Sequence, residues 1–145
     1  MKRKMKKKIT SALVLTLVLA ALLTLVACNT VDATGLWENA THRRDMEFGS
    51  GALTVYVEVK AGEESVTFTV NTDETILGDA LLEHGLIDGE ESQYGLYVKK
   101  VNGIVADYDV DQSYWGFYKD GEYMLTGVDV TEIENGAHYE LVYVK

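Results

Sequence analysis

Aromatic side chains are concentrated between Ser92 and Gly127, where they alternate with several glycines. Aromatic rings at this density have two common roles in a protein. They fill the core of a β-sheet, or they form a stacking platform for a flat ligand. The sequence leaves both interpretations open, so the placement of these rings decides what the protein can bind. The aromatic residues of this stretch include Tyr94, Tyr97, Tyr114, Trp115, Phe117 and Tyr118.

The segment Tyr114-Trp-Gly-Phe-Tyr118 is typical of a β-strand, in which successive side chains point to opposite faces of the sheet. Trp115 and Phe117 are therefore expected on one face and Gly116 on the other. Gly95 and Gly116 have no side chain, so a ligand could approach the backbone closely at both positions. One face is expected to be core, and alternation alone does not assign which.

Residues with reactive side chains form no recognised catalytic pattern. The chain has one cysteine and neither a Gly-x-Ser-x-Gly nor a His-Glu-x-x-His motif. The run from Asp107 to Asp111 has the opening spacing of an EF-hand calcium loop, but Gln112 and Tyr118 stand where that loop needs Gly and Glu. We therefore expect a solvated acidic turn, with a looser calcium site as the alternative. The sequence predicts no catalytic residue, no metal site and no enzyme.

The N-terminal segment has the pattern of an export signal. Six basic residues precede an apolar run from Ile9 to Ala27. The only cysteine, Cys28, follows Leu25-Val-Ala27, which resembles the bacterial lipobox. The resemblance implies that residues 1–27 are a lipoprotein signal peptide and that Cys28 carries lipid. The alternative is a membrane span, since the apolar run is just long enough to cross a bilayer.

The charge of the exported part excludes one class of partner. Residues 1–27 hold six of the 13 Lys and Arg residues and none of the 23 Asp and Glu residues. Seven basic residues therefore remain against 23 acidic ones, a net charge of −16. Such a surface repels phosphate backbones, so nucleic acid is not an expected partner. It also repels anionic lipid headgroups, so attachment to the membrane is expected to depend on the lipid anchor.

The exported part divides into a predicted tether and a predicted domain. Residues 28–50 are polar and irregular, which is typical of a flexible tether, and residues 51–145 have the size of one domain. Alternating apolar residues predict strands, and the dipeptides Asn102-Gly103 and Asp120-Gly121 predict two-residue hairpin turns. Residues 88–91 are expected to be a loop. The predicted strands cover residues 53–59, 66–70, 95–101, 104–106, 114–118, 123–125 and 138–144.

One helix is expected between Thr72 and His84. Thr72 and Asp73 are candidate N-caps, Ile76, Leu77, Ala80 and Leu81 recur at helical spacing, and Gly85 suits the left-handed position after the last turn. A hairpin, one helix and a run of further strands predict an α+β fold, a mostly antiparallel sheet with the helix across one face. This order fits a β-grasp.

Residues 66–145 resemble the transcobalamin-like C-terminal domain family of bacterial lipoproteins and surface proteins. The resemblance rests on the order and spacing of several short motifs rather than on one strong motif. It implies a soluble-ligand-binding β-grasp, which in transcobalamin and intrinsic factor closes over cobalamin while a helical barrel domain holds the other side. The motifs are Thr75–Gly85, Gln93–Val98, Val101–Ile104, Tyr114–Tyr118, Leu125–Val128 and Gly136–Leu141.

The resemblance also implies where a ligand would lie. A corrin is a large, flat macrocycle fringed with amides, and tyrosines offer it both flat faces and hydrogen-bonding tips. Two features depart from the family: this chain shows no helical domain, and Gly116 stands where the vitamin carriers tend to have a polar side chain. The implied ligand-contacting residues are Ser92, Gln93, Tyr94, Gly95, Tyr97, Trp115, Gly116 and Phe117.

These observations predict a lipoprotein anchored in the cell membrane and facing away from the cytoplasm. It is expected to require no cofactor and to bind a small soluble ligand. The best candidate is cobalamin or a related corrinoid, bound alone or together with a separate helical-barrel or transporter partner. The alternative is an adhesion or interaction module of the same fold that binds a protein or a glycan.

Overall fold

The computed structural model describes residues 33–145. Cys28 and the predicted signal peptide lie outside these residues, so their predicted roles stay predictions. Three α-helices, one 3₁₀-helix and nine strands occur in the described part. In chain order they are α2 (Ala33–Trp37), β1 (Met46–Phe48), β2 (Leu53–Ala61), β3 (Glu64–Thr72), α3 (Leu77–Glu83), β4 (Ile87–Ser92), β5 (Gly95–Val101), β6 (Ile104–Val105), α4 (Tyr108–Asp111), β7 (Tyr114–Lys119), β8 (Glu122–Tyr123), η1 (Val128–Val130) and β9 (His138–Val144).

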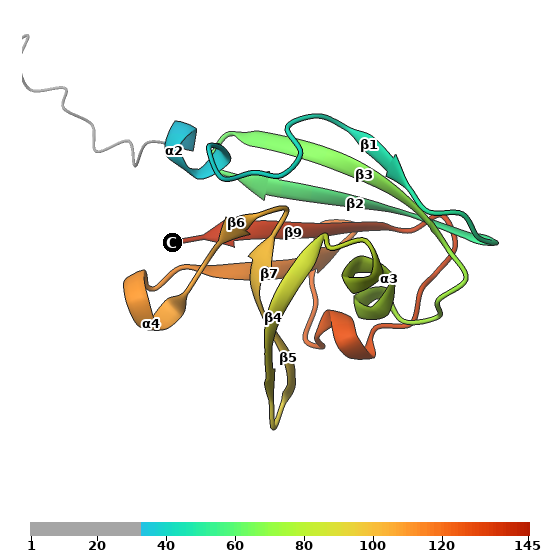
Figure 1. The fold of residues 1–145 in the computed structure, drawn as a ribbon. Coiled ribbons are helices and arrows are strands. Elements are labelled where there is room, and N and C mark those ends of the chain that lie inside the picture. Colours follow the sequence, from blue (N-terminus) through green and yellow to red (C-terminus); the bar gives the residue numbers. More distant parts are fainter. Residues whose placement is uncertain (1–32) are drawn as a thin grey trace, which may run out of the picture. The chain divides into compact units, whose positions relative to one another are not determined.

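The strands form two sheets. The larger sheet has the order β1-β3-β2-β9-β7-β8, and the smaller has the order β4-β5-β6. Most neighbours are antiparallel, whereas β1 pairs with β3 and β2 pairs with β9 in parallel. Helix α3 and the β4–β5 hairpin lie on the same side of the larger sheet (Figure 1). The predicted α+β fold class, with a mostly antiparallel sheet, is confirmed.

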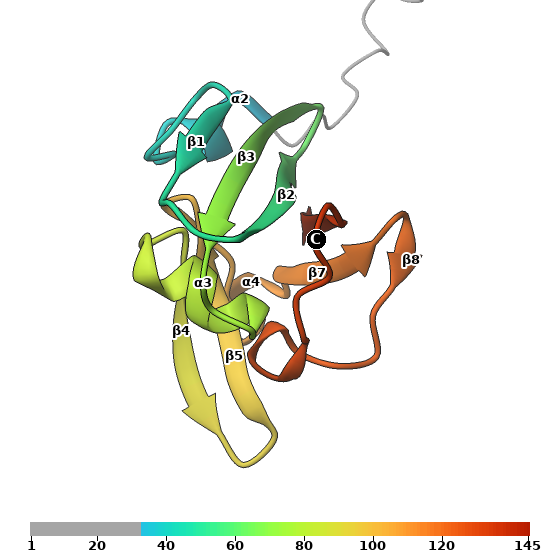
Figure 2. The same cartoon turned by 90° about the vertical axis from the view of Figure 1, so that its right-hand side faces the viewer.

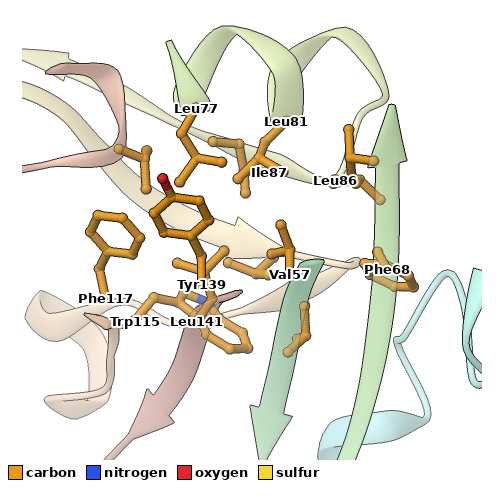
Figure 3. Packing of buried hydrophobic residues seen from close by; sticks show 14 of the residues in the cluster. Val57, Phe68, Leu77, Leu81, Leu86, Ile87, Trp115, Phe117, Tyr139 and Leu141 are labelled. Carbon is orange, nitrogen blue, oxygen red and sulfur yellow. The ribbon is translucent and has the colours of Figure 1, made fainter. Parts of the chain in front are cut away.

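The core lies between the larger sheet and α3. Alternation along β2 buries Val55, Val57 and Val59, and the same face of the sheet carries Tyr139 and Leu141 from β9. Leu77 and Leu81 extend from α3 toward these residues (Figure 3). Burying each such side chain stabilises the fold by about 1.5–3 kcal/mol. The predicted apolar side of the helix is therefore its core side.

Two hairpin turns have the backbone that the sequence predicts. Asn102 and Gly103 have φ angles of 50° and 81°, and Asp120 and Gly121 have the same pair of values. Positive φ at both central residues is the requirement of the two-residue turn that matches the twist of antiparallel strands. These turns connect β5 to β6 and β7 to β8.

The predicted start of the helix was wrong. Helix α3 begins at Leu77, and its N-cap position is Ile76, which makes no capping side-chain hydrogen bond. The two expected caps act in the preceding loop instead. Thr72 Oγ1 accepts a hydrogen bond from the Glu74 amide, and Asp73 Oδ1 accepts one from the Ala52 amide. The expectation of a single helix was also wrong, because α2 and α4 add two short helices.

The boundary predicted between the tether and the domain, at residues 50 and 51, lies too late in the chain. Strand β1 pairs in parallel with β3 and forms an edge of the larger sheet. Trp37 is buried in the core cluster, and its Nε1 donates a hydrogen bond to the Ala61 carbonyl at 2.8 Å. Buried Asn102 donates to the His42 carbonyl and accepts from the His42 amide. Residues 33–50 therefore belong to the domain that was predicted to begin at residue 51.

Two acidic segments differ from their predicted state. Residues 88–91, expected to be a loop, lie in β4 and pair with β5. Cross-strand ion pairs offset the poor strand propensity of this sequence, and they join Lys99 to Glu90 and Lys100 to Asp88. The predicted acidic turn at 107–111 contains α4, which Asp107 caps by accepting a hydrogen bond from the Asp109 amide.

The β4–β5 hairpin extends away from the rest of the domain in two perpendicular views (Figure 1, Figure 2). Its turn includes Tyr94, whose side chain is 89% exposed. Within residues 33–145, no helix has the length and apolar character needed to cross a bilayer.

Candidate aromatic binding site

An open cavity of about 250 Å³ lies between β5, β7 and the segment from Met124 to Val128. We call it the aromatic cavity. One side is formed by three consecutive residues of β5, and the base is formed by side chains of β7 and β9. Its lining consists of Leu96, Tyr97, Val98, Trp115, Phe117, Tyr123, Met124, Leu125, Thr126, Gly127, Val128 and Leu141.

Trp115 and Phe117 belong both to the core and to the wall of the aromatic cavity. They lie on the same face of β7, and each is 8% exposed. Phe117 stacks on Tyr139 with ring centroids 6.0 Å apart (Figure 3). Trp115 meets Tyr143 edge to face, with ring centroids 5.6 Å apart. These contacts hold the two rings at fixed positions. The face of β7 that carries Trp115 and Phe117 is therefore the core face, which alternation alone did not decide. The edge of this face is open to the cavity.

The aromatic cavity has no charged side chain in its lining. This is unusual in a chain with a formal net charge of −10. Thr126 and the two tyrosines add hydroxyl groups, and the remaining lining side chains are apolar apart from the indole nitrogen. The chemistry of the lining suits a neutral group with large apolar faces, and it disfavours a charged one because a buried charge needs a partner.

The indole nitrogen of Trp115 is the one polar atom of the lining that is both buried and unpartnered. Nε1 has no hydrogen-bond acceptor among the residues that the structure describes. Leaving a buried donor unpaired costs about 1–3 kcal/mol. Nε1 has almost no accessible surface, so a ligand oxygen could accept this hydrogen bond only after neighbouring side chains moved aside.

The segment from Met124 to Val128 forms the side of the cavity opposite β5. It is joined to β7 through the Met124 amide, which donates to the Phe117 carbonyl at 2.9 Å. Leu125 is 95% exposed at this margin. Sequence reasoning did not place these residues in the site. Residues 123–125 were predicted as a hairpin strand, and a single exposed apolar residue beside Thr126-Gly127 is too common at protein surfaces to signal a site.

The structure brings together Tyr97, Trp115 and Phe117 of the eight predicted ligand-contacting residues. Ser92, Gln93, Tyr94 and Gly95 are instead at the turn of the β4–β5 hairpin and do not line the cavity. Ser92 Oγ stabilises this turn by donating to the Gly95 carbonyl and accepting from the Tyr94 amide.

Gly116 does not line the aromatic cavity, and its expected role in backbone access to a ligand stays a prediction. A side chain at position 116 would point away from the aromatic cavity, because it would lie on the face of β7 opposite to Trp115 and Phe117. A Cβ added there would lie 3.0 Å from Cε2 of the Tyr118 ring. The glycine therefore makes room for a neighbouring tyrosine on the outer face of the sheet.

Two of the three acidic residues at α4, Asp107 and Asp111, have side-chain partners within the chain. Asp111 binds Lys145 and Ser113, and Asp107 binds Lys99. The hydrogen bonds from Lys145 and from Ser113 lower the pKa of Asp111 from 3.8 to about 2. Across the described residues, no group of three His, Cys, Asp or Glu side chains is arranged to hold a metal ion.

The fold and the site define a small α+β domain with an uncharged aromatic cavity at the margin of its core. A search of solved structures finds a protein from Ruminococcus gnavus ATCC 29149, provisionally described as metal-binding, at 32% sequence identity and a TM-score of 0.61. The match covers 65% of this chain and 98% of that protein. The chain therefore belongs to the same family as the Ruminococcus gnavus protein.

Haptocorrin, solved in complex with Cbi (cobinamide), is a more distant structural neighbour. It matches at 21% identity and a TM-score of 0.53, over 68% of this chain and 26% of haptocorrin. The two proteins share a fold over this part of haptocorrin. No known family profile and no curated protein matches the sequence.

Proposed function

We propose that the protein is a surface lipoprotein whose aromatic cavity binds the apolar edge of a neutral soluble ligand, with a corrinoid as the first candidate. In this proposal Cys28 carries the lipid and holds the domain outside the cytoplasm. The protein acts by binding and has no catalytic role.

The observation that carries the binding proposal is the uncharged aromatic cavity, whose wall includes Trp115 with its unpartnered Nε1. A corrinoid has amide oxygens around a flat ring system, so it can offer an apolar surface to Tyr97 and Phe117, and an acceptor to Nε1 if the side chains around that atom move on binding. The fold shared with haptocorrin supports this class of ligand, because that protein was solved with a corrinoid. The resemblance of residues 66–145 to the transcobalamin-like domains supports the same class.

The size of the aromatic cavity defines how much of such a ligand could enter. At about 250 Å³ it is smaller than the roughly 300–1,000 Å³ of pockets that enclose a whole drug-sized ligand. One edge of a macrocycle would enter, and the rest would lie over the exposed Leu125 and Tyr123. A ligand bound on one side only keeps its other face in water. We therefore expect micromolar affinity, about −8 kcal/mol, unless a partner covers that face.

A titration of the full-length protein in detergent with cobinamide tests the proposal, followed by calorimetry and by visible absorbance. We expect binding with a dissociation constant in the micromolar range. Trp115→Phe keeps an aromatic ring and removes the donor, so it should weaken binding about 2- to 10-fold, as one neutral hydrogen bond implies. Trp37→Phe is the matched control, because Trp37 is also buried but already donates to Ala61.

Thermal unfolding of each variant separates loss of contact from loss of fold. A wild-type protein that binds neither cobinamide nor cyanocobalamin at tens of micromolar would contradict the corrinoid proposal. An equal loss of affinity in Trp115→Phe and Trp37→Phe would show that the indole donor of Trp115 does not contact the ligand.

One observation favours a second candidate, an interaction module that binds a protein or a glycan. Tyr94 at the hairpin turn and Leu125 beside the cavity are almost fully exposed. Large exposed side chains of this kind are common at surfaces that contact a macromolecule. This candidate becomes the better one if the titrations show no corrinoid binding.

A further inference from the structure

Asp129 connects the turn end of the β4–β5 hairpin to the rest of the domain. This residue lies in η1, and its Oδ2 accepts a hydrogen bond from the Leu96 amide at 3.2 Å. Leu96 is the second residue of β5, next to the hairpin turn. A two-stranded hairpin is marginally stable in water by itself. A hydrogen bond to a carboxylate at this end therefore restrains a part of the chain that extends away from the core (Figure 2).

Three glycines make room for Asp129. A Cβ added at Gly95 or at Gly127 would overlap its carboxylate oxygens, and a Cβ added at Gly78 would lie 2.9 Å from its Cα. Gly95 also has a φ angle of +102°, which other residues rarely adopt. The hairpin and the segment before η1 thus meet the Asp129 carboxylate, helix α3 meets the Asp129 backbone, and each approaches at a glycine.

The same carboxylate contacts one residue from each side of the aromatic cavity without lining it. Leu96, which it binds, begins the β5 side of the lining, and Gly127 belongs to the opposite side. We propose that Asp129 is a positioning residue that holds the β4–β5 hairpin at a fixed spacing from residues 124–128 and thereby sets the width of the aromatic cavity. The consequence for binding rests on the proposed function, whereas the position of the hairpin does not.

Two substitutions distinguish this role from a general effect on folding. Asp129→Ala removes the acceptor, and Asp129→Asn keeps an oxygen at the same place without the charge. Asp109→Ala is the matched control, because Asp109 is an exposed carboxylate on α4 that lies outside the hairpin. Thermal unfolding of all three variants shows whether the domain remains folded.

The first measurement needs no ligand. Amide hydrogen exchange of the full-length protein in detergent, read at Leu96, Tyr97 and Val98, reports the freedom of the hairpin. In Asp129→Ala we expect exchange at Leu96 to be about tenfold faster, the factor expected when a hydrogen bond to a charged group is lost. Asp129→Asn should lie between Asp129→Ala and the wild type, and Asp109→Ala should equal the wild type. Unchanged exchange in Asp129→Ala would overturn the inference.

The second measurement uses cobinamide as the probe. Asp129→Ala should raise its dissociation constant about tenfold, mainly through faster dissociation, since most changes in affinity within one site appear in the off-rate. Faster exchange combined with unchanged affinity would overturn the role of Asp129 in positioning the cavity. If the wild type fails to bind cobinamide, the proposed function fails, and exchange at Leu96 still decides whether Asp129 holds the hairpin.

Discussion

Leu81→Ala tests whether α3 is the element that closes the core. Leu81 is fully buried against the larger sheet, and the substitution removes the three carbon atoms beyond Cβ. At about 0.8 kcal/mol for each buried methylene, the transfer term alone comes to about 2.4 kcal/mol. Helix and sheet are both held by their own hydrogen bonds, so the space left behind should close only in part. The cavity adds to the cost, and we expect a loss of about 3–4 kcal/mol, within the range of about 2–5 for such changes.

The next residue of the same helix provides the control. Leu82 is 43% exposed, so Leu82→Ala makes an identical chemical change in the same helix with much less burial. Urea unfolding of a chain that begins at Asn29, followed by far-ultraviolet circular dichroism, gives both free energies of unfolding. We expect Leu82→Ala to cost less than about 1 kcal/mol, as is usual for residues near the surface. Equal losses in the two variants would refute the assignment of the buried side of α3.

Three further predictions concern other parts of the chain. Cys28→Ser should release the protein from the membrane fraction if that cysteine carries the anchor, and unchanged retention on cell fractionation would show that an uncleaved span holds it. Asn102→Ala should cost about 2–4 kcal/mol in urea unfolding, because both backbone groups of His42 lose their partner and alanine replaces asparagine at a φ of 50°. The lowered pKa of Asp111 implies a stabilising contribution that is complete above the unfolded value of 3.8 and is lost as pH falls through about 2. A carboxyl ¹³C titration of Asp111 with a midpoint near 3.8 would contradict the contacts with Lys145 and Ser113.

The strands and turns that local chemistry specifies were the predictable part of the fold. Alternation marks β2 and β9 because half of their residues face the core, and Asn102-Gly103 marks a turn because few other pairs adopt two positive φ angles. Strand β4 was missed because its acidic residues have low strand propensity. Its pairing depends on lysines ten or so positions later in the chain. Strand β1 was missed because three residues are too few to show a period.

Only the part of the candidate site that belongs to strand β7 could be predicted from a local pattern in the sequence. Trp115 and Phe117 share a face because they are two residues apart, and that spacing is visible in the sequence. The opposite side, from Met124 to Val128, faces β5, which ends at Val101, more than 20 residues earlier in the chain. Contacts between segments distant in the chain leave no local pattern. The same reason hid Asp129, whose partner Leu96 is 33 residues away.

The central position of β9 has a consequence for how the protein is made. In the larger sheet, β9 lies between β2 and β7, so it joins the half formed by β1, β3 and β2 to the half formed by β7 and β8. The pair that connects them brings Tyr56 beside His138. During synthesis, the ribosome must therefore release about 80 residues after β2 before this sheet can close, and pairings over such distances form slowly. For the lipoprotein proposed above, a chain that stays open during this interval would remain suited to threading through an export channel, which accepts unfolded polypeptide.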